Sequence, residues 1–232
     1  YPLRRQRQMC IRDRFNAMVD EMFDYGRFIL KEKRKNPSDD LLSAIANAEI
    51  EGEKLTDEFL DGSWLLIIFA GNDTTRNTMS GGIKLLHENP KQKELLMQDT
   101  ELLTNFIHET IRCVSPVIHM RRTSLEETEI SGQRIGPFEK ISLWYGAANR
   151  DPDIFENPNE FNILRENADK HLAFGIGRHT CLGKPIALMQ LKEFYSQFLT
   201  RFKDFELNGE WKVAPNNFVH AIQEMPIKFT PE

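Results

Sequence analysis

The stretch FGIGRHTCLG, residues 174–183, decides how the rest of this chain is interpreted. It holds one cysteine, Cys181, in a glycine-rich loop that is followed closely by Pro185. Proline is favoured in the first turn of a helix, so the pattern predicts a helix that starts directly after the loop. A helix N-terminus favours the thiolate form of a cysteine, and glycines let the backbone approach a flat ligand. The stretch therefore predicts a ligand-binding cysteine; the alternative is a buried cysteine beside a tight turn.

The same residues resemble the cysteine signature of the cytochromes P450, Phe-x-x-Gly-x-Arg-x-Cys-x-Gly, with His179 where many members have arginine. The resemblance implies haem b as the cofactor and Cys181 as the axial ligand of its iron. A thiolate ligand pushes electron density onto the iron and helps to cleave the O–O bond. The resemblance further implies that the loop contacts the haem, with His179 as a donor to a propionate, through Phe174, Gly175, Gly177, His179 and Gly183.

A second motif, AGNDTT at residues 70–75, lies midway along a long helix predicted from a cap at Thr56 to about Glu88. The apolar run at 64–69 predicts that this helix is buried through the centre of a domain. Acids and alcohols in mid-helix can simply bond the preceding turn. The family resemblance instead implies that Ala70 and Gly71 make room for dioxygen beside the haem, and that Asp73 and Thr74 deliver protons.

Glu109 and Arg112 match the Glu-x-x-Arg motif of the same family. At this spacing the two could form an ordinary surface pair worth a few tenths of a kcal/mol. The resemblance implies a structural network that anchors the cysteine loop. Many members complete it with an arginine in a Pro-x-Arg-Phe motif, but this chain has Pro-Asn-Glu-Phe at 158–161, and Arg150 is the candidate substitute.

Arg122 lies at the family's distance before Gly132 for an arginine that pairs with a haem propionate. His119 and Arg121 beside it can equally be packed or solvated side chains. By family position, apolar residues near the oxygen site are expected to contact the substrate: Leu66, Ile67, Ile118, Phe218 and Val219.

Composition limits the remaining possibilities. The 232 residues are 40% hydrophobic and 28% charged, which is typical of a globular protein. The longest wholly apolar run, residues 64–70, is far shorter than the ~20 residues of a membrane span. A net charge of −5 argues against a nucleic-acid binder. Three scattered cysteines exclude a disulfide scaffold and favour a reducing, cytoplasmic location.

The periodicity predicts a mainly α fold with a minor β part. The resemblance implies that this is the C-terminal portion of the cytochrome P450 fold. Helices are expected at 15–35, 38–47, 56–88, 91–99, 102–114 and 184–202, with a polar hairpin or loop at 49–55, short strands between 116 and 143 and a β-like tail. Residues 1–14 show no periodicity, and RRQRQMCIRDR is similar to the translation of a transposase adapter used in library preparation. We therefore expect 1–14 to be non-native, and 15–232 to be part of a monooxygenase domain that lacks its N-terminal half.

The resemblance implies a haem-thiolate monooxygenase that takes electrons from a ferredoxin and its NAD(P)H-dependent reductase. The motifs at 71–82 and 119–123 are most similar to bacterial terminal hydroxylases of alkanes and fatty acids, and residues 45–55 are similar to the branch that oxidises steroid side chains. Two other hypotheses stay open. One is a haem-binding protein that does not activate dioxygen, and the other is a piece that is inactive by itself.

Overall fold

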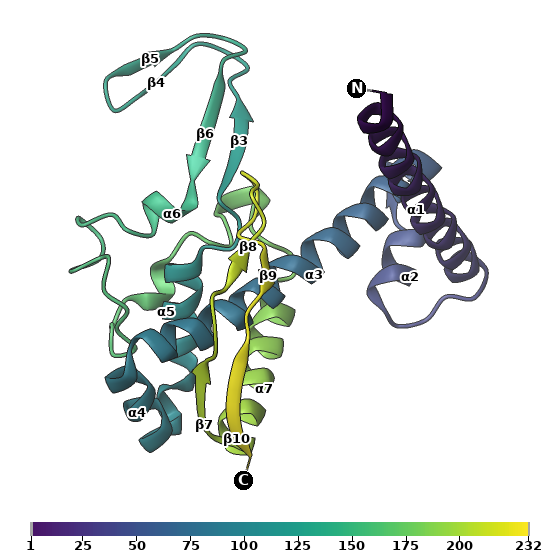
Figure 1. Cartoon of the computed structure of the whole chain (residues 1–232). Coiled ribbons are helices and arrows are strands. Elements are labelled where there is room, and N and C mark those ends of the chain that lie inside the picture. The colour runs from purple at the N-terminus through teal and green to yellow at the C-terminus, as the bar shows by residue number, and fades with distance from the viewer. Residues whose placement is uncertain (1, 232) are drawn as a thin grey trace. The chain divides into compact units, whose positions relative to one another are not determined.

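The computed structural model describes the backbone of residues 2–231 and the side chains of residues 11–202 and 204–230. Helices dominate and the strands form short two-stranded sheets, as the sequence predicted (Figure 1). The chain divides into two compact units, residues 1–70 and 71–232. The helices are α1 (Pro2–Lys35), α2 (Leu41–Ala46), α3 (Asp57–Glu88), α4 (Pro90–Gln98), α5 (Leu103–Val114), α6 (Tyr145–Ala148) and α7 (Lys184–Arg201), with 3-10 turns η1 (Thr100–Leu102), η2 (Ala168–Lys170) and η3 (Gly177–His179).

The first unit packs α1, α2 and the start of α3 around a small core of Leu30, Ala46, Leu60 and Trp64. Trp64 also donates a hydrogen bond from Nε1 to the carbonyl of Met22, 3.0 Å away. A short hairpin, β1 (Glu49–Ile50) with β2 (Glu53–Lys54), confirms the expected polar hairpin. Helix α3 begins where the Thr56 side chain accepts from the N–H of Phe59, at 3.3 Å, which confirms the predicted cap.

Two predictions about this unit are wrong. Helix α1 begins at Pro2, not at residue 15, because the Arg- and Gln-rich segment contains good helix formers and no interior glycine or proline. The apolar run of α3 is not buried all round: Leu66 is 67% exposed and Phe69 48% exposed. Only the side carrying Leu60 and Trp64 faces the small core, so apolar composition alone did not tell which sides are covered.

The second unit is built on a larger core shared by α3, α4, α5 and α7. Phe106 of α5 packs edge-on against Tyr195 of α7, with ring centres 4.7 Å apart. The buried hydroxyl of Tyr195 donates toward the carbonyls of Thr78 and Met79, at 2.9 and 3.0 Å, and so joins α7 to α3. Gly82 is required here, because a Cβ at that position would lie 2.0 Å from the Tyr195 oxygen.

The strands of the second unit are antiparallel pairs. In Figure 1, β3 and β6 run side by side and lead into the β4–β5 hairpin, and β7 and β10 lie along α7. The hairpin turn at Ser131-Gly132 has positive φ at both residues, as the sequence predicted for a turn there. The strands are β3 (His119–Thr123), β4 (Thr128–Ile130), β5 (Gln133–Ile135), β6 (Lys140–Trp144), β7 (Phe202–Leu207), β8 (Lys212–Val213), β9 (Ile222–Glu224) and β10 (Ile227–Pro231).

Candidate haem site

The cysteine loop, defined here as residues 174–183, leads directly into α7. Its first and last parts are joined by a hydrogen bond from the N–H of Cys181 to the carbonyl of Phe174, at 2.8 Å. Gly175 and Gly177 have φ values of +70° and +72°, a region that L side chains rarely adopt, so glycine is needed at both turns. Cys181 is exposed, and the predicted helix starts at Lys184 with proline in its first turn. The loop therefore holds one thiol at the surface, ahead of a helix N-terminus.

The surroundings of this thiol fit a flat apolar group with acidic edges. Around Cys181 the loop and α7 expose large apolar side chains that a soluble surface does not normally present together: Ile176, Leu182, Ile186 and Met189. Cationic donors lie in the same segment, since Arg178 and His179 are exposed. A haem has an apolar ring, an iron that takes a thiolate and two propionates, so the chemistry of this donor set fits it. No cluster of three His, Cys, Asp or Glu side chains that could hold a bare metal ion occurs among the described residues.

Cys113, the other cysteine with a described side chain, has a different environment. Its Sγ accepts from the Arg112 guanidinium at 3.3 Å, and burial raises the pKa of the thiol to about 11. It lies within α5, a helix that contains no glycine. A half-buried thiol with a raised pKa is a poor ligand, so the environment favours Cys181 over Cys113 as a thiolate donor.

Beneath the loop, Glu109 and Arg112 form a fully buried ion pair and not the surface pair that their spacing also allowed. The carboxylate receives both Nε and Nη2 of Arg112, at 2.7 and 2.8 Å. A second guanidinium, that of Arg165, donates Nε to the same carboxylate at 3.2 Å. Two cations thus share one buried anion, and their other N–H groups donate to backbone carbonyls of the irregular stretch between α6 and η2: Asn149, Glu156, Asn157, Pro158 and Glu160.

The expectation that Arg150 completes this network is wrong. Arg150 donates instead to the carbonyls of Cys113 and Gly146, at 2.8 and 3.2 Å, and supports the end of α5. Arg165 was missed because it belongs to an irregular stretch in which no periodicity marks an inward position. The available signal was a lone arginine four residues after Phe161, in a segment otherwise rich in Asn, Asp and Glu.

Asn149 joins this network to the loop. Its carbonyl accepts from Arg112, and its side-chain oxygen accepts from the N–H of Leu172 at 2.6 Å, just ahead of the loop. The side-chain nitrogen of the same buried asparagine donates to Ser115. The Glu109 network, defined as Glu109, Arg112, Arg165 and Asn149, is therefore physically continuous with the segment that carries Cys181.

The motif at 70–75 lies in mid-helix, as predicted. Asp73 pairs with Arg76 one turn later, at 2.9 Å, and its side chain is 32% exposed. Thr74 is half-buried, and Thr78 donates its hydroxyl to the Thr74 carbonyl at 2.8 Å. Gly71 has open space where a Cβ would be, and Ala70 is exposed. Nothing in this segment contradicts the expected roles, which remain predictions.

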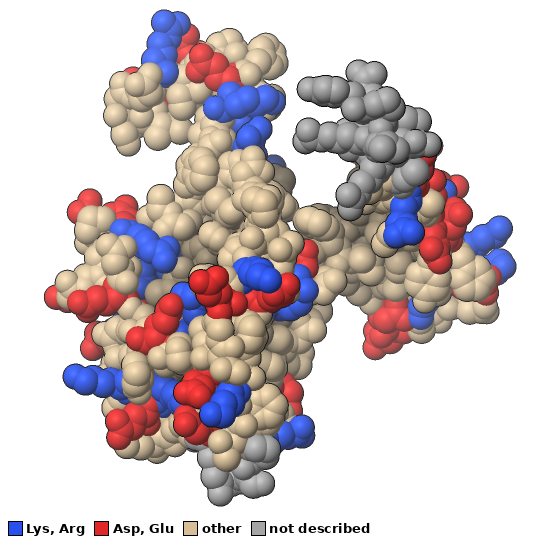
Figure 2. Space-filling model, in the orientation of Figure 1, with Lys and Arg blue, Asp and Glu red and all other residues tan. Residues whose placement is uncertain are grey.

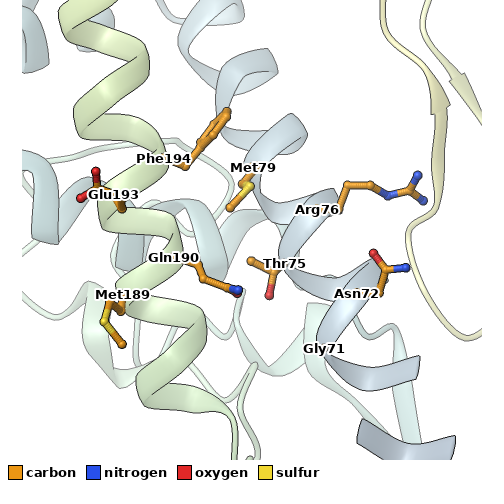
Figure 3. Close-up of a pocket in the computed structure, with 9 residues that line it drawn as sticks. All are labelled: Gly71, Asn72, Thr75, Arg76, Met79, Met189, Gln190, Glu193 and Phe194. Atoms are coloured by element: carbon orange, nitrogen blue, oxygen red, sulfur yellow. The ribbon is translucent and has the colours of Figure 1, made fainter. Parts of the chain in front are cut away.

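An open groove of about 610 Å³ lies between α3 and α7 (Figure 3). Thr75 and Gln190 point toward each other across it, whereas Arg76 points away from α7. Its described lining residues include Gly71 but neither Asp73 nor Thr74. The full lining is Gly71, Asn72, Thr75, Arg76, Met79, Met189, Gln190, Glu193 and Phe194.

The predicted substrate-contact residues fall into two groups. Ile118, Phe218 and Val219 come together, because the N–H of Ile118 donates to the carbonyl of Phe218 at 2.8 Å and a β-bridge joins Val117 to Val219. Leu66 and Ile67 lie on the part of α3 that belongs to the first unit. Arg122, expected to bind a propionate, is exposed on β3 and donates to the Arg121 carbonyl.

Charged side chains are intermixed on the face shown in Figure 2, where no large single-sign patch of described residues is visible.

His119, for which the sequence left both a packed and a solvated position open, is buried and stacks on Trp144 with ring centres 4.9 Å apart. None of the helices described is apolar over a length that would cross a bilayer.

These features define a class, a helical protein with an exposed cysteine before a helix and a buried Glu–Arg pair beneath it. Comparison with known proteins then identifies the family. The family model described as Cytochrome P450 matches residues 7–230, and the chain belongs to this family. Membership and fold imply a haem held through a cysteine thiolate.

Individual relatives agree with this assignment. The chain is 38% identical over 211 residues to the steroid C26-monooxygenase of Mycobacterium tuberculosis, covering 90% of this chain and 56% of that protein. It is 31% identical over 220 residues to the methyl-branched lipid omega-hydroxylase of Mycobacterium bovis, covering 94% of this chain and 51% of the relative. The solved structure of cytochrome P450-153 from Novosphingobium aromaticivorans superposes with a TM-score of 0.86 at 36% identity, over 94% of this chain and 54% of that one. The chain thus spans about half the length of the relatives it matches.

Proposed function

We propose that the protein is a haem-thiolate monooxygenase, which inserts one oxygen atom of O2 into an unactivated C–H bond, and that Cys181 is the iron ligand. The observation that carries the proposal is the contrast between two thiols. Cys181 is exposed in a glycine loop with apolar side chains around it, whereas Cys113 is half-buried in a helix and desolvation raises its pKa to about 11.

Different residues of the loop are proposed to contact different parts of the haem. When bound, the group supplies dioxygen activation and transfer of one oxygen atom to the substrate. Cys181 provides the thiolate, and the glycine turns keep side chains away from the face of the ring. We propose that His179 and Arg122, which are both exposed, donate to the propionates.

Substitution of each cysteine tests the ligand assignment. In the haem-loaded protein, Cys181→Ala should abolish the thiolate-type Soret shift of the reduced carbon-monoxide complex. Cys113→Ala is the matched control and should retain the shift, because the raised pKa keeps its half-buried thiol protonated. If the shift survives in Cys181→Ala, the assignment is wrong.

Asp73 and Thr74 are proposed to move protons to the reacting oxygen. Arg76 restrains the Asp73 carboxylate from the next turn of α3, which keeps the acid at a fixed place on the helix. Thr74→Ala should therefore consume reductant and release hydrogen peroxide in place of product. Thr104→Ala, at an exposed position of α5, is the control. Coupling that is unchanged in Thr74→Ala would favour the alternative function, a haem-binding protein without dioxygen activation.

The electron donor is proposed to be a ferredoxin with its NAD(P)H-dependent reductase. Arg178 is exposed on the loop, and Lys184 at the start of α7 lies over the Phe174 ring at 5.6 Å. Two cations at the cysteine side of an acidic chain favour an acidic partner. Reversing both charges should slow ferredoxin-driven reduction in a salt-sensitive way, and equal rates would remove this surface from the proposal.

The substrate is proposed to be oxidised at or next to the end of a medium or long alkyl chain, as in an alkane or fatty acid. Ile118 and Val219 of the second unit carry no charge, and each buried methylene contributes ~0.8 kcal/mol, so an apolar chain can be held there without ionic contacts. One relative is a methyl-branched lipid omega-hydroxylase, whereas another is a steroid C26-monooxygenase, which keeps a steroid side chain as the second candidate.

Incubation with an alkane, a fatty acid and a sterol decides between these substrates. Product from the first two supports the leading proposal, and product from the sterol alone supports the second candidate. Oxidation of none of the three, together with turnover of a small polar or aromatic compound, would reject both while leaving the monooxygenase reaction intact.

A further inference from the structure

A buried histidine, His171, meets a half-buried one, His108, immediately ahead of the cysteine loop. His108 on α5 directs Nδ1 at Nε2 of His171, 3.4 Å away, and the ring centres are 5.6 Å apart. His171 is only 7% exposed, and its other face lies against Phe174. Neither histidine is used by the oxygen chemistry proposed above.

The backbone fixes which ring nitrogens carry protons. The N–H of Ala173 points at Nδ1 of His171 from 3.3 Å, so that nitrogen must be an acceptor. Neutral His171 then carries its proton on Nε2 and donates it to His108, whose own proton is on its far nitrogen. Only this arrangement, with both rings neutral, satisfies every contact.

We propose that His108 and His171 are positioning residues for the haem ligand, a neutral hydrogen-bonded pair that holds the start of the cysteine loop against α5. This rests on the proposed function of Cys181. Two hydrogen bonds link the pair to Cys181. The Ala173 N–H donates to His171, and the carbonyl of the following residue, Phe174, accepts from the Cys181 N–H at 2.8 Å. On the other side, Leu172 is held by Asn149 of the Glu109 network.

A proton added to the pair cannot be accommodated. Placed on His171 it opposes the Ala173 N–H, and placed on His108 between the rings it opposes the His171 N–H. The charged groups facing the pair are Asp169 of η2, which favours a proton, and Lys184 of α7, which opposes one. Burial outweighs Asp169 and acts in the same direction as Lys184, so the pKa of His108 is lowered and that of His171 is lowered to about 4.

Two measurements on the chain without haem test the pair itself. Ring ¹⁵N shifts should show His171 protonated at Nε2 and unprotonated at Nδ1 at neutral pH. The Ala173 amide should be protected from hydrogen exchange, and His171→Leu should reduce that protection roughly tenfold. His171→Asn is the matched rescue, because the asparagine oxygen takes the place of Nδ1 and cannot titrate. A proton on Nδ1, or equal exchange of Ala173 in all three proteins, would overturn the proposal.

A third measurement on the haem-loaded protein tests the positioning role. The fraction of reduced carbon-monoxide complex with a thiolate-type Soret band should fall in His171→Leu and be restored in His171→Asn. As the pH falls from 6.5 toward 4, wild type should lose this band while His171→Asn keeps it. Identical bands and pH profiles in the three proteins would overturn the positioning role. A wild type that never shows a thiolate band would reject the ligand proposal instead, while the two haem-free measurements still decide the pair.

Discussion

The Glu109 network and the cysteine loop are neighbours that satisfy their polar groups in opposite ways. In the network, Glu109 and Arg112 are fully buried, and their charges are met by each other, by Arg165 and by backbone carbonyls. In the loop, Cys181 is exposed and apolar side chains such as Leu182 face outward. The network needs nothing further, whereas the loop presents a thiol and an apolar surface that another group can cover. A buried network whose polar groups are all paired stabilises the fold, whereas an exposed loop with a free thiol and an apolar surface indicates a binding site.

The largest effect is expected where the network loses its only anion. Glu109→Gln leaves the guanidiniums of Arg112 and Arg165 buried without a carboxylate, which should destabilise the protein by about 3–5 kcal/mol. Urea unfolding measures the change. Glu101→Gln, at an exposed position of η1, is the matched control and should stay within about 0.5 kcal/mol. Equal midpoints for the two variants would contradict a structural role for the network.

A smaller loss of stability should show whether Arg165 or Arg150 completes the network of Glu109 and Arg112. Arg165→Leu removes a donor from Glu109 and from three carbonyls, and we expect a loss of about 2–3 kcal/mol. Arg150→Leu breaks only its bonds to two carbonyls in a half-buried position, for a loss of about 1 kcal/mol. If Arg150→Leu proves the more damaging in the same urea assay, Arg165 is not the residue that completes the network.

The sequence predicted the parts of this comparison that are local. The glycine loop, the helix after it and the Glu–Arg pair each lie within one short segment, where turn chemistry or helical spacing decides the geometry. The helix at 57–88 was predicted almost to the residue, because its cap and its terminal Asn-Pro are strong signals.

The parts that were missed depend on contacts between distant segments. Arg165 reaches Glu109 from an irregular stretch, and His171 meets His108 from 63 residues further along the chain. No periodicity in the sequence predicts either contact. The burial expected at 64–69 failed for a related reason. An apolar run predicts a helix that can be covered, but only its neighbours decide which sides are covered.

Within the loop itself, backbone strain is the next test. Gly177 has φ of +72° and no atom within 4 Å of the place that a Cβ would take, so Gly177→Ala meets no clash and only a conformational cost of about 1 kcal/mol. Gly82→Ala is the comparison in the core, where the new Cβ would collide with the Tyr195 hydroxyl. Thermal unfolding should rank Gly82→Ala as the less stable variant. The reverse order would show that the loop is more constrained than its exposure indicates.

The smallest change in stability is expected at the thiols. There the two regions are better distinguished by how fast each thiol reacts. In a Cys10→Ser background, Cys181→Ala should alter the free energy of unfolding by less than about 0.5 kcal/mol, because the exposed side chain contributes little packing.

Alkylation of the same background should modify Cys181 first and Cys113 far more slowly. The pKa of Cys113 is raised to about 11 by burial, so at pH 8 only about one thousandth of that thiol is thiolate. Because a raised pKa keeps the group protonated until the pH approaches it, its alkylation rate should climb roughly tenfold per pH unit between 8 and 11. Mass spectrometry of the labelled peptides follows both sites. A Cys113 that reacts as fast as Cys181 at pH 8 would show that the network opens readily to solvent, and the contrast between the two regions would then be lost.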